Sequence, residues 1–228
     1  PSADTVFNMN SLSSTPFNPA SLVAREAHRK RGRLLDIGTG TGYFADTMAR
    51  RGWKVEAVEK SPQARAFAKE HFDLDVKPES ALKEFAPGSF DVITLWHVME
   101  HLEHLNETWE MLRELLTEKG MLIVAVPNCS SYDAGRYGEY WAAYDVPRHL
   151  WHFTPVTIQQ LASRHGFIMA ARHPMPFDAF YVSMLSEKHR GSSCSFLKGM
   201  YAGTLAWFST LGRKERSSSM IYVFRKKR

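Results

Sequence analysis

Short apolar runs alternate with segments of helical periodicity through the first half of the chain. Glycine or proline bounds most of the runs, as is typical of strands buried on both faces of a parallel sheet. Between the runs, apolar residues recur with the spacing of an amphipathic helix. Strands are expected at residues 33–37, 53–58, 72–76 (the weakest), 90–96 and 121–126, and helices at residues 19–31, 43–50, 62–71 and 106–116. This βαβ series predicts a parallel sheet with helices on both faces.

Capping residues mark the expected helix ends. Asn18 and Ser61 each precede a proline, and an Asn or Ser followed by Pro is a strong signal for a helix start. Glycine favours a helix end, so Gly32 is expected to end the first helix and Gly120 the helix that begins near residue 106.

The pattern loosens in the second half of the chain. Aromatic residues cluster between positions 132 and 144, and Thr154 with Pro155 is expected to open a helix that runs to about His165. Late strands are expected at residues 167–172 and 220–225, around an insertion at about residues 174–219 that packs on the sheet or covers the site. Residues 1–18 are predicted to be a flexible arm, and residues 19–228 to be one domain.

Composition and charge narrow the function classes. With 228 residues, 44% hydrophobic and 23% charged, the chain is long enough for one core and too apolar for general disorder. Neither a secretory signal nor a membrane span is expected. Cys129 and Cys194 show no zinc or disulfide spacing, which favours a reducing cytoplasm. The net charge of +5 sits in short basic runs without interleaved aromatic residues, so we interpret these runs as solvated surface and tail rather than as a phosphate or nucleic-acid contact.

A glycine-rich turn follows the first expected strand, at the carboxyl end where α/β sheets bind ligands. It runs Asp36-Ile37-Gly38-Thr39-Gly40-Thr41-Gly42, and its glycines allow the backbone to approach a ligand closely. The dinucleotide fingerprint GxGxxG needs glycine at position 43, where this chain has Tyr43. Glu59 follows the second strand and is placed to accept two hydrogen bonds from a ribose diol. The turn and the carboxylate predict a cofactor that contains adenosine without a 2′-phosphate.

Three segments resemble, in this order, the motifs of class I S-adenosylmethionine (SAM)-dependent methyltransferases: residues 36–42, Glu59 and residues 90–102. The resemblance covers about residues 34–166. It implies an α/β, Rossmann-like fold with a mostly parallel seven-stranded sheet, helices on both faces and an antiparallel last strand, for which residues 220–225 are the candidate. It also implies SAM as the cofactor and S-adenosylhomocysteine as the product.

The same resemblance assigns the cofactor contacts. Gly38 and Gly40 would approach the methionine part of SAM and Glu59 the ribose hydroxyls. Trp96 and His97 would form the rim beside adenine. The full implied set is Asp36, Gly38, Thr39, Gly40, Gly42, Glu59, Lys60, Ser80, Ala81, Trp96 and His97. Many members have an acidic residue near the adenine amine, whereas this chain has Glu79-Ser80-Ala81 there. Either the backbone at Ser80 and Ala81 serves, or Glu79 is shifted.

A second constellation comprises His97, Glu100, His101 and His104, which would share one face if the segment is helical. It resembles the Glu-x-x-Glu-His segment of ubiquinone-pathway O-methyltransferases, whose acidic residues and histidine bind a divalent ion near the acceptor hydroxyl. The HxxEH string also matches an inverted zinc-protease motif, but the methyltransferase-type strand before it already accounts for it. Packing or cofactor contact, a general base and a metal site all stay open. We predict His101 as a base and no metal, with His97, Glu100 and His101 as ligands if one binds.

A third constellation lies in residues 144–155, where family members place acceptor-recognition loops. It resembles a segment found in bacterial members of the superfamily, and its basic residues could bind an acidic acceptor or carry a proton. His149 is the second candidate base. The predicted acceptor contacts are Tyr140, Trp141, Arg148 and His152. In the alternative interpretation, these polar groups cap helices and the aromatic residues close a hydrophobic wall.

The motifs together predict a small-molecule methyltransferase, and the histidines favour O-methylation, because a hydroxyl acceptor must lose its proton. A nucleic-acid (RNA) methyltransferase or a non-catalytic SAM-binding protein is an alternative, although the chain lacks the Asn-Pro-Pro-Tyr motif of amino-directed DNA methylation. An NAD-dependent oxidoreductase shares the strand-turn-helix start and is a further alternative. The sequence specifies neither the acceptor nor the oligomeric state.

Overall fold

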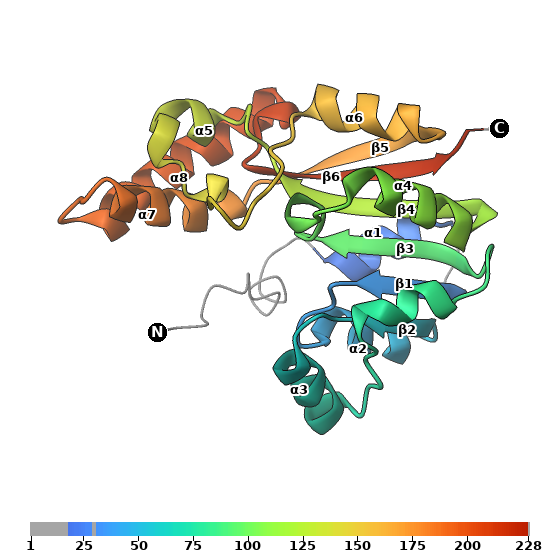
Figure 1. Ribbon diagram of the computed structural model, residues 1–228. Helices are drawn as coiled ribbons and strands as arrows, with labels where there is room; N and C mark the ends of the chain where they lie inside the picture. Colours follow the sequence, from blue (N-terminus) through green and yellow to red (C-terminus); the bar gives the residue numbers. More distant parts are fainter. Residues whose placement is uncertain (1–17, 29–30, 228) are drawn as a thin grey trace.

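A computed structural model describes residues 18–28 and 31–227. The expected N-terminal arm lies outside the described residues except for Asn18. The sheet has six strands in the order β2-β1-β3-β4-β6-β5 (Figure 1). The strands are β1 Arg33–Ile37, β2 Lys54–Val58, β3 Phe90–Trp96, β4 Leu116–Pro127, β5 Phe167–Met175 and β6 Ser219–Lys226. The α-helices are α1 Pro19–Glu26, α2 Tyr43–Arg50, α3 Pro62–Phe72, α4 Leu105–Leu115, α5 Tyr132–Tyr137, α6 Pro155–Arg164, α7 Asp178–His189 and α8 Ser195–Gly212.

The sheet is mixed in the way that the resemblance implied. Strands β2, β1, β3 and β4 are parallel, and β6 runs antiparallel between β4 and β5. The antiparallel last strand is therefore confirmed. One core cluster joins α4 and α6 to one face of the sheet through residues such as Trp109 and Ile158. A second cluster joins α1 and α2 to the other face through Val23 and Met48. Helices thus cover both faces, as the βαβ pattern predicted.

The sheet has six strands rather than the expected seven, because residues 72–76 do not form a strand. Helix α3 continues to Phe72, and Asp73 then turns the chain with a left-handed φ of 54°. Only a short stretch is left before a 3₁₀ helix, η2 Glu79–Glu84, begins. That stretch makes a single isolated parallel bridge, between Val58 and Lys77. The polar residues that alternate along it leave too little apolar surface for a buried strand.

The predicted end of the first helix was wrong, and so was the role of Gly120 as a helix end, although both starts signalled by the caps were confirmed. The side chains of Asn18 and Ser61 accept hydrogen bonds at the starts of α1 and α3. Helix α1, however, ends at Glu26, before Gly32. Helix α4 ends at Leu115, and Gly120 lies inside β4. A Cβ on Gly120 would lie 2.9 Å from the Thr117 carbonyl oxygen, so this glycine permits a tight irregularity in the strand rather than a helix end.

The expected insertion is a helical hairpin, α7 and α8, between β5 and β6, and β5 runs to Met175 beyond its expected end at residue 172. Figure 1 shows the hairpin beyond one end of the sheet, beside α5. The two helices pack closely where α8 has glycine. A Cβ on Gly199 would lie 2.5 Å from the Met184 Cα, and one on Gly203 would lie 2.7 Å from the Phe180 Cα, so no larger residue fits at either position. No helix in residues 18–28 and 31–227 is long and apolar enough to cross a membrane.

Candidate active site

The glycine turn between β1 and α2 is shaped by backbone that only glycine adopts readily. Gly38 and Gly40 have φ values of +68° and +58°. The amide of Gly38 donates to the Val58 carbonyl oxygen at 2.8 Å, which ties the turn to the end of β2. A Cβ on Gly38 would lie 2.5 Å from Val98 Cγ2, whereas one on Gly40 would meet nothing within 4 Å. The turn is therefore tightly packed behind Gly38 and open above Gly40.

Glu59 follows β2 and is held against this turn by two backbone amides. Its Oε2 accepts from the Gly40 amide and its Oε1 from the Ser61 amide, both at 2.9 Å. Each carboxylate oxygen has further lone pairs, so these bonds orient the group and leave it able to accept from a ligand. The second strand and the glycine turn thus act as one unit.

Asp36 is a buried carboxyl group at the end of β1. Its Oδ1 accepts from the Thr94 hydroxyl at 2.6 Å, and its Oδ2 makes no hydrogen bond within the described part of the chain. Burial raises the pKa of Asp36 to about 7, an effect that the hydroxyls of Thr39 and Thr94 partly offset. A cationic donor in the site would pair with Oδ2 and restore the ionised form.

These groups open into a cleft of about 1180 Å³, which extends from the glycine turn to the loop after β3 and to α7. Most predicted site residues line this cleft: Asp36, Gly38, Thr39, Gly40, Glu59, Lys60, Trp96, His97, Glu100, His101, Arg148 and His149. Glu79, at the start of η2, also lines it. Ser80 and Ala81 do not, so the shifted Glu79 is the polar side chain of this segment that faces the cleft. Gly42 lies behind it, as the N-cap of α2.

Three of the four predicted acceptor contacts lie away from the cleft. Trp141 is buried, and its indole nitrogen donates to Asp133 at 2.8 Å. Tyr140 is exposed beneath the Arg190 guanidinium. The His152 Nε2 lies 3.1 Å from the Tyr144 carbonyl oxygen. For these residues the structure favours the alternative interpretation, in which the aromatic and polar groups of the segment support each other.

The condition for a shared helix face, a helical segment from His97 to His104, is not met. Only a short 3₁₀ turn forms there, η3 Met99–His101, and His104 is the residue before α4. His97 has a left-handed φ of 54°, which directs its ring away from the position it would have on a helix. The four side chains therefore do not share a helix face.

His97 instead lies between two buried carboxylates. Its Nδ1 is 3.4 Å from Glu100 Oε1, and its Nε2 is 3.5 Å from Asp178 Oδ2 on α7. Burial alone would lower the pKa of His97, but the two carboxylates overcome that effect and raise it to about 10. The ring is thus an imidazolium that links the loop after β3 to α7. Sequence reasoning missed Asp178, because its only signal was an acid in the first turn of a helix.

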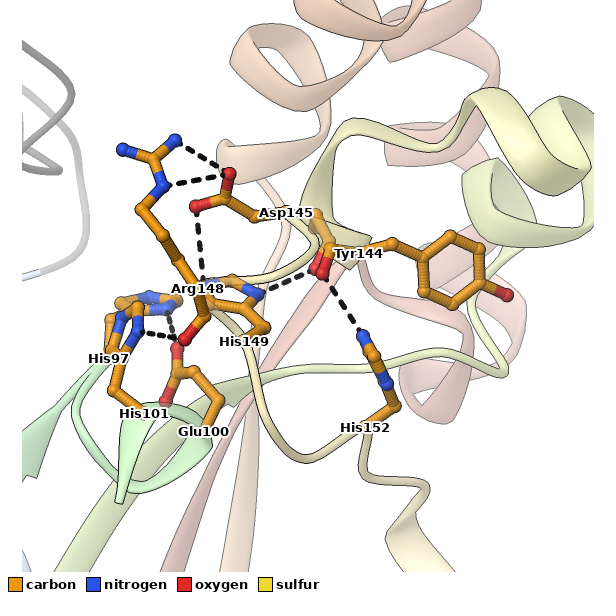
Figure 2. Close-up of polar contacts among 9 residues, drawn as sticks. His97, Glu100, His101, Tyr144, Asp145, Arg148, His149 and His152 are labelled. Carbon is orange, nitrogen blue, oxygen red and sulfur yellow. Dashed lines mark hydrogen bonds and ion pairs between the residues drawn. The ribbon is translucent and has the colours of Figure 1, made fainter. Parts of the chain in front are cut away.

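A second polar group forms where residues 145–150 return to η3, as Figure 2 shows. Ligand atoms of Glu100, His101 and His149 lie within 4.8 Å of one another, and the two imidazole rings meet edge to face at 4.6 Å. The loop is held there because the Leu150 amide donates to the Glu100 carbonyl oxygen at 2.8 Å. The carboxylate of Glu100 is buried, and apart from the ion pair of its Oε1 with His97 neither oxygen has a polar side-chain partner within hydrogen-bond geometry among the described residues.

Backbone carbonyls select the tautomer of both histidines. The Nδ1 of His101 lies 3.0 Å from the Arg148 oxygen, and the Nδ1 of His149 lies 2.8 Å from the Ala143 oxygen. Because a carbonyl oxygen only accepts, each Nδ1 carries hydrogen, and each neutral ring has its lone pair on Nε2. Burial lowers the pKa of His149, although nearby carboxylates such as Glu100 oppose the shift. His149 is therefore a neutral base at pH 7.

Comparison with known proteins supports the same assignment. The family model described as "Methyltransferase domain" matches residues 17–171. The mitochondrial ubiquinone biosynthesis O-methyltransferase of Schizosaccharomyces pombe is 33% identical over 123 residues, which cover 50% of this chain and 45% of that protein. The ubiquinone biosynthesis O-methyltransferase of a Caulobacter species is 35% identical over 103 residues, or 42% and 41% of the two chains. The chain thus matches less than half the length of these two relatives.

Solved structures share the fold at low sequence identity. A putative sarcosine dimethylglycine methyltransferase from Galdieria sulphuraria has a TM-score of 0.63 at 16% identity, over 91% of this chain and 83% of that one. A Haemonchus contortus phosphoethanolamine N-methyltransferase, solved with S-adenosyl-L-methionine, has a TM-score of 0.61 at 21% identity, over 91% and 52%. The family match extends over more than half of the chain, from α1 through the glycine turn and into β5. The chain therefore belongs to the methyltransferase-domain family, within the class I SAM-dependent methyltransferases.

Proposed function

We propose that this protein transfers the methyl group of SAM to a hydroxyl oxygen of a small molecule. The observation that carries the proposal is a neutral histidine base, His149, in the same cleft as the glycine turn and Glu59. SAM supplies a methyl group that its sulfonium charge makes electrophilic. The names of the curated relatives, which are O-methyltransferases, support an oxygen acceptor.

The residues present fit SAM in three respects. The space above Gly40 leaves the backbone of the turn accessible. Glu59 is oriented by two amides and suits the vicinal hydroxyls of a ribose. Asp36 offers a buried oxygen without a hydrogen bond, which suits the positively charged amino group of the methionine part. We assign these three residues to cofactor binding.

The protein's own chemistry is then to orient the acceptor and to remove its proton. Methyl transfer depends mainly on holding the acceptor atom in line, so positioning supplies most of the rate. Nε2 of His149 would accept the hydroxyl proton. Asp145 Oδ2, which lies 3.9 Å from that Nε2, and the nearby Glu100 would stabilise the imidazolium that results. His101 is the other candidate base, and it contacts His149 directly.

The variants His101→Ala and His149→Ala test the base. The residue that removes the proton should lose about 10²- to 10⁴-fold in turnover with small phenolic and other hydroxylated acceptors, whereas SAM affinity measured by calorimetry stays within about twofold. His152→Ala is the matched control, because it lies in the same segment outside the cleft. Unaltered turnover in both His101→Ala and His149→Ala would refute the proposal of a histidine base. Absent SAM binding by the unmodified protein would remove the whole proposal.

One observation favours a second candidate, in which the reaction depends on a divalent metal. Glu100, His101 and His149 present one carboxylate and two imidazoles within 4.8 Å, a donor set that suits zinc and similar transition metals. This set replaces the predicted one, since His97 pairs with Asp178 instead. Chelation by EDTA followed by addition of Zn²⁺, Mn²⁺ or Mg²⁺ separates the two: a metal-dependent enzyme loses and regains turnover, and a purely histidine-based one does not.

A cytoplasmic location is part of the same proposal and rests on the two cysteines, which are both unbridged. Fractionation of cells that express the protein, with immunodetection of each fraction, tests it.

A further inference from the structure

Helix α8 carries large apolar side chains on the face that points away from the protein. Leu197, Tyr201, Phe208 and Leu211 are 69%, 62%, 56% and 66% exposed, and Met200 is exposed between them. Their spacing of three, four or seven residues places all five on one stripe of the helix. At a rise of about 1.5 Å per residue the stripe is about 21 Å long. We call these five residues the outer stripe.

The outer stripe is not the face by which α8 is held. The opposite face, with Gly199, Ala202, Gly203 and Ala206, is buried, and its two glycines meet α7 directly. Helix α8 is thus apolar on both sides. A helix that is apolar all round is normally buried on all sides. A continuous apolar stripe left in water marks an interaction surface.

Cationic side chains flank the outer stripe in sequence, at the end of α7, within α8 and just after it. Between residues 188 and 216 the chain has six lysines and arginines and one acidic residue, Glu215. The six basic residues are all exposed, namely Lys188, Arg190, Lys198, Arg213, Lys214 and Arg216. Glu215 already pairs with Arg172 of β5 and so does not neutralise them. The helical hairpin therefore combines an exposed apolar stripe with exposed cations before, within and after α8.

We propose that α8 lies in the surface of an anionic phospholipid bilayer, with the outer stripe among the acyl chains and the cations at the headgroups. An exposed apolar stripe with cations close to it in sequence suits an anionic membrane interface, which offers acyl chains beneath negatively charged headgroups. A second copy of the protein fits less well, because pairing the outer stripes of two copies would bring two sets of these six cations toward one another, and like charges repel.

Helix α8 is not part of the cleft, so the inference stands apart from the proposed function. None of the five outer-stripe residues lines the cleft. Binding to vesicles is therefore measured without reference to catalysis.

The experiment is flotation of the full chain with vesicles of phosphatidylcholine alone or with about one third phosphatidylglycerol. We expect binding to the anionic vesicles, weaker binding to the neutral ones, and weakening by added salt. Phe208→Ser with Leu211→Ser should reduce the partition coefficient by roughly tenfold or more, since each side chain leaves the acyl region. Lys198→Ala with Arg213→Ala should reduce it by roughly fivefold for each cation.

Matched controls separate the surface from general effects. Val156→Ser with Ile168→Ser removes two exposed apolar residues of α6 and β5, and Lys54→Ala with Lys83→Ala removes two exposed cations elsewhere. These variants should bind vesicles as the unmodified protein does. SAM affinity measured by calorimetry on every variant should match that of the unmodified protein.

Two results would overturn the inference. One is equal flotation of the α8 variants and their controls. The other is a dimer, seen by light scattering, that does not bind vesicles and that Phe208→Ser with Leu211→Ser dissociates, because the outer stripe would then be covered by a second copy.

Discussion

Replacing the buried Asp36 with asparagine should stabilise the cofactor-free protein in a way that depends on pH. The carboxyl group is 1% exposed, and its Oδ2 has no hydrogen-bond partner in the described part of the chain. Ionisation of a carboxyl group in this buried environment costs free energy, because no ion pair or second hydrogen bond among the described residues compensates for the lost hydration. Asp36→Asn keeps the shape of the side chain and removes the ionisation.

The size and sign of the effect follow from the pKa. Folding raises the pKa of Asp36 from 3.8 to about 7, so the unfolded chain loses this proton first. The contribution of Asp36 to the stability of the unmodified protein therefore falls as pH rises from about 4 to 7 and is level above that. At about 1.4 kcal/mol for each pKa unit, the upper limit is ~4 kcal/mol. The asparagine variant does not pay this cost at any pH.

Urea denaturation at pH 5 and pH 8 measures the prediction. The free energy of unfolding of Asp36→Asn minus that of the unmodified protein should be roughly 2–3 kcal/mol larger at pH 8 than at pH 5. The variant thus gains stability over the unmodified protein as pH rises. Any pH-independent change in packing or hydrogen bonding cancels in this difference. Asp46→Asn, which removes a partly exposed carboxylate paired with Arg50, is the control and should show no comparable change. The reasoning is refuted if the difference for Asp36→Asn is the same at both pH values.

Three further predictions concern the same site. Glu59→Gln should weaken SAM binding by about tenfold or more in calorimetry, because a charged acceptor of the ribose hydroxyls is lost, and affinity equal to that of the unmodified protein would contradict this role. Gly38→Ala should lower the free energy of unfolding in urea more than Gly88→Ala does. Both positions have a φ near +65°, but only at Gly38 does the new Cβ meet another side chain, 2.5 Å away. Equal losses of stability would exclude the clash at Gly38. His97→Gln should lower the free energy of unfolding by about 3–5 kcal/mol, because two buried carboxylates lose their shared cation. The control His71→Gln, at an exposed position, should leave it nearly unchanged. Equal effects of the two substitutions would show that His97 is not an imidazolium.

The part of the cleft that we propose binds the cofactor was predictable because its determinants are local in sequence. The glycines at 38 and 40 and the acid at 59 lie at the ends of consecutive strands, and parallel strands bring such ends together whatever the rest of the chain does. Most helix starts were predictable because capping acts over a few residues, whereas the antiparallel orientation of the last strand was implied by the family resemblance. The predicted strand at residues 72–76 was wrong because α3 continues to Phe72, and the few residues after it alternate between polar and apolar.

The acceptor half was decided by tertiary contacts. A spacing of three and four residues placed His97, Glu100 and His101 on one helix face, but the chain forms a 3₁₀ turn with His97 in a left-handed conformation, so Asp178 on α7 becomes its partner. The pairing of His101 with His149 likewise depends on the hydrogen bond that returns residue 150 to residue 100.

The sequence by itself therefore determined the fold class and the glycine-rich turn, because these depend on periodicity and on the backbone freedom of glycine, and the resemblance of its motifs indicated the family. Only the tertiary structure decided which titratable groups face one another in the cleft and which face of α8 is left in water. Burial and electrostatic pairing act through space between residues far apart in the chain, and a linear pattern does not encode those distances.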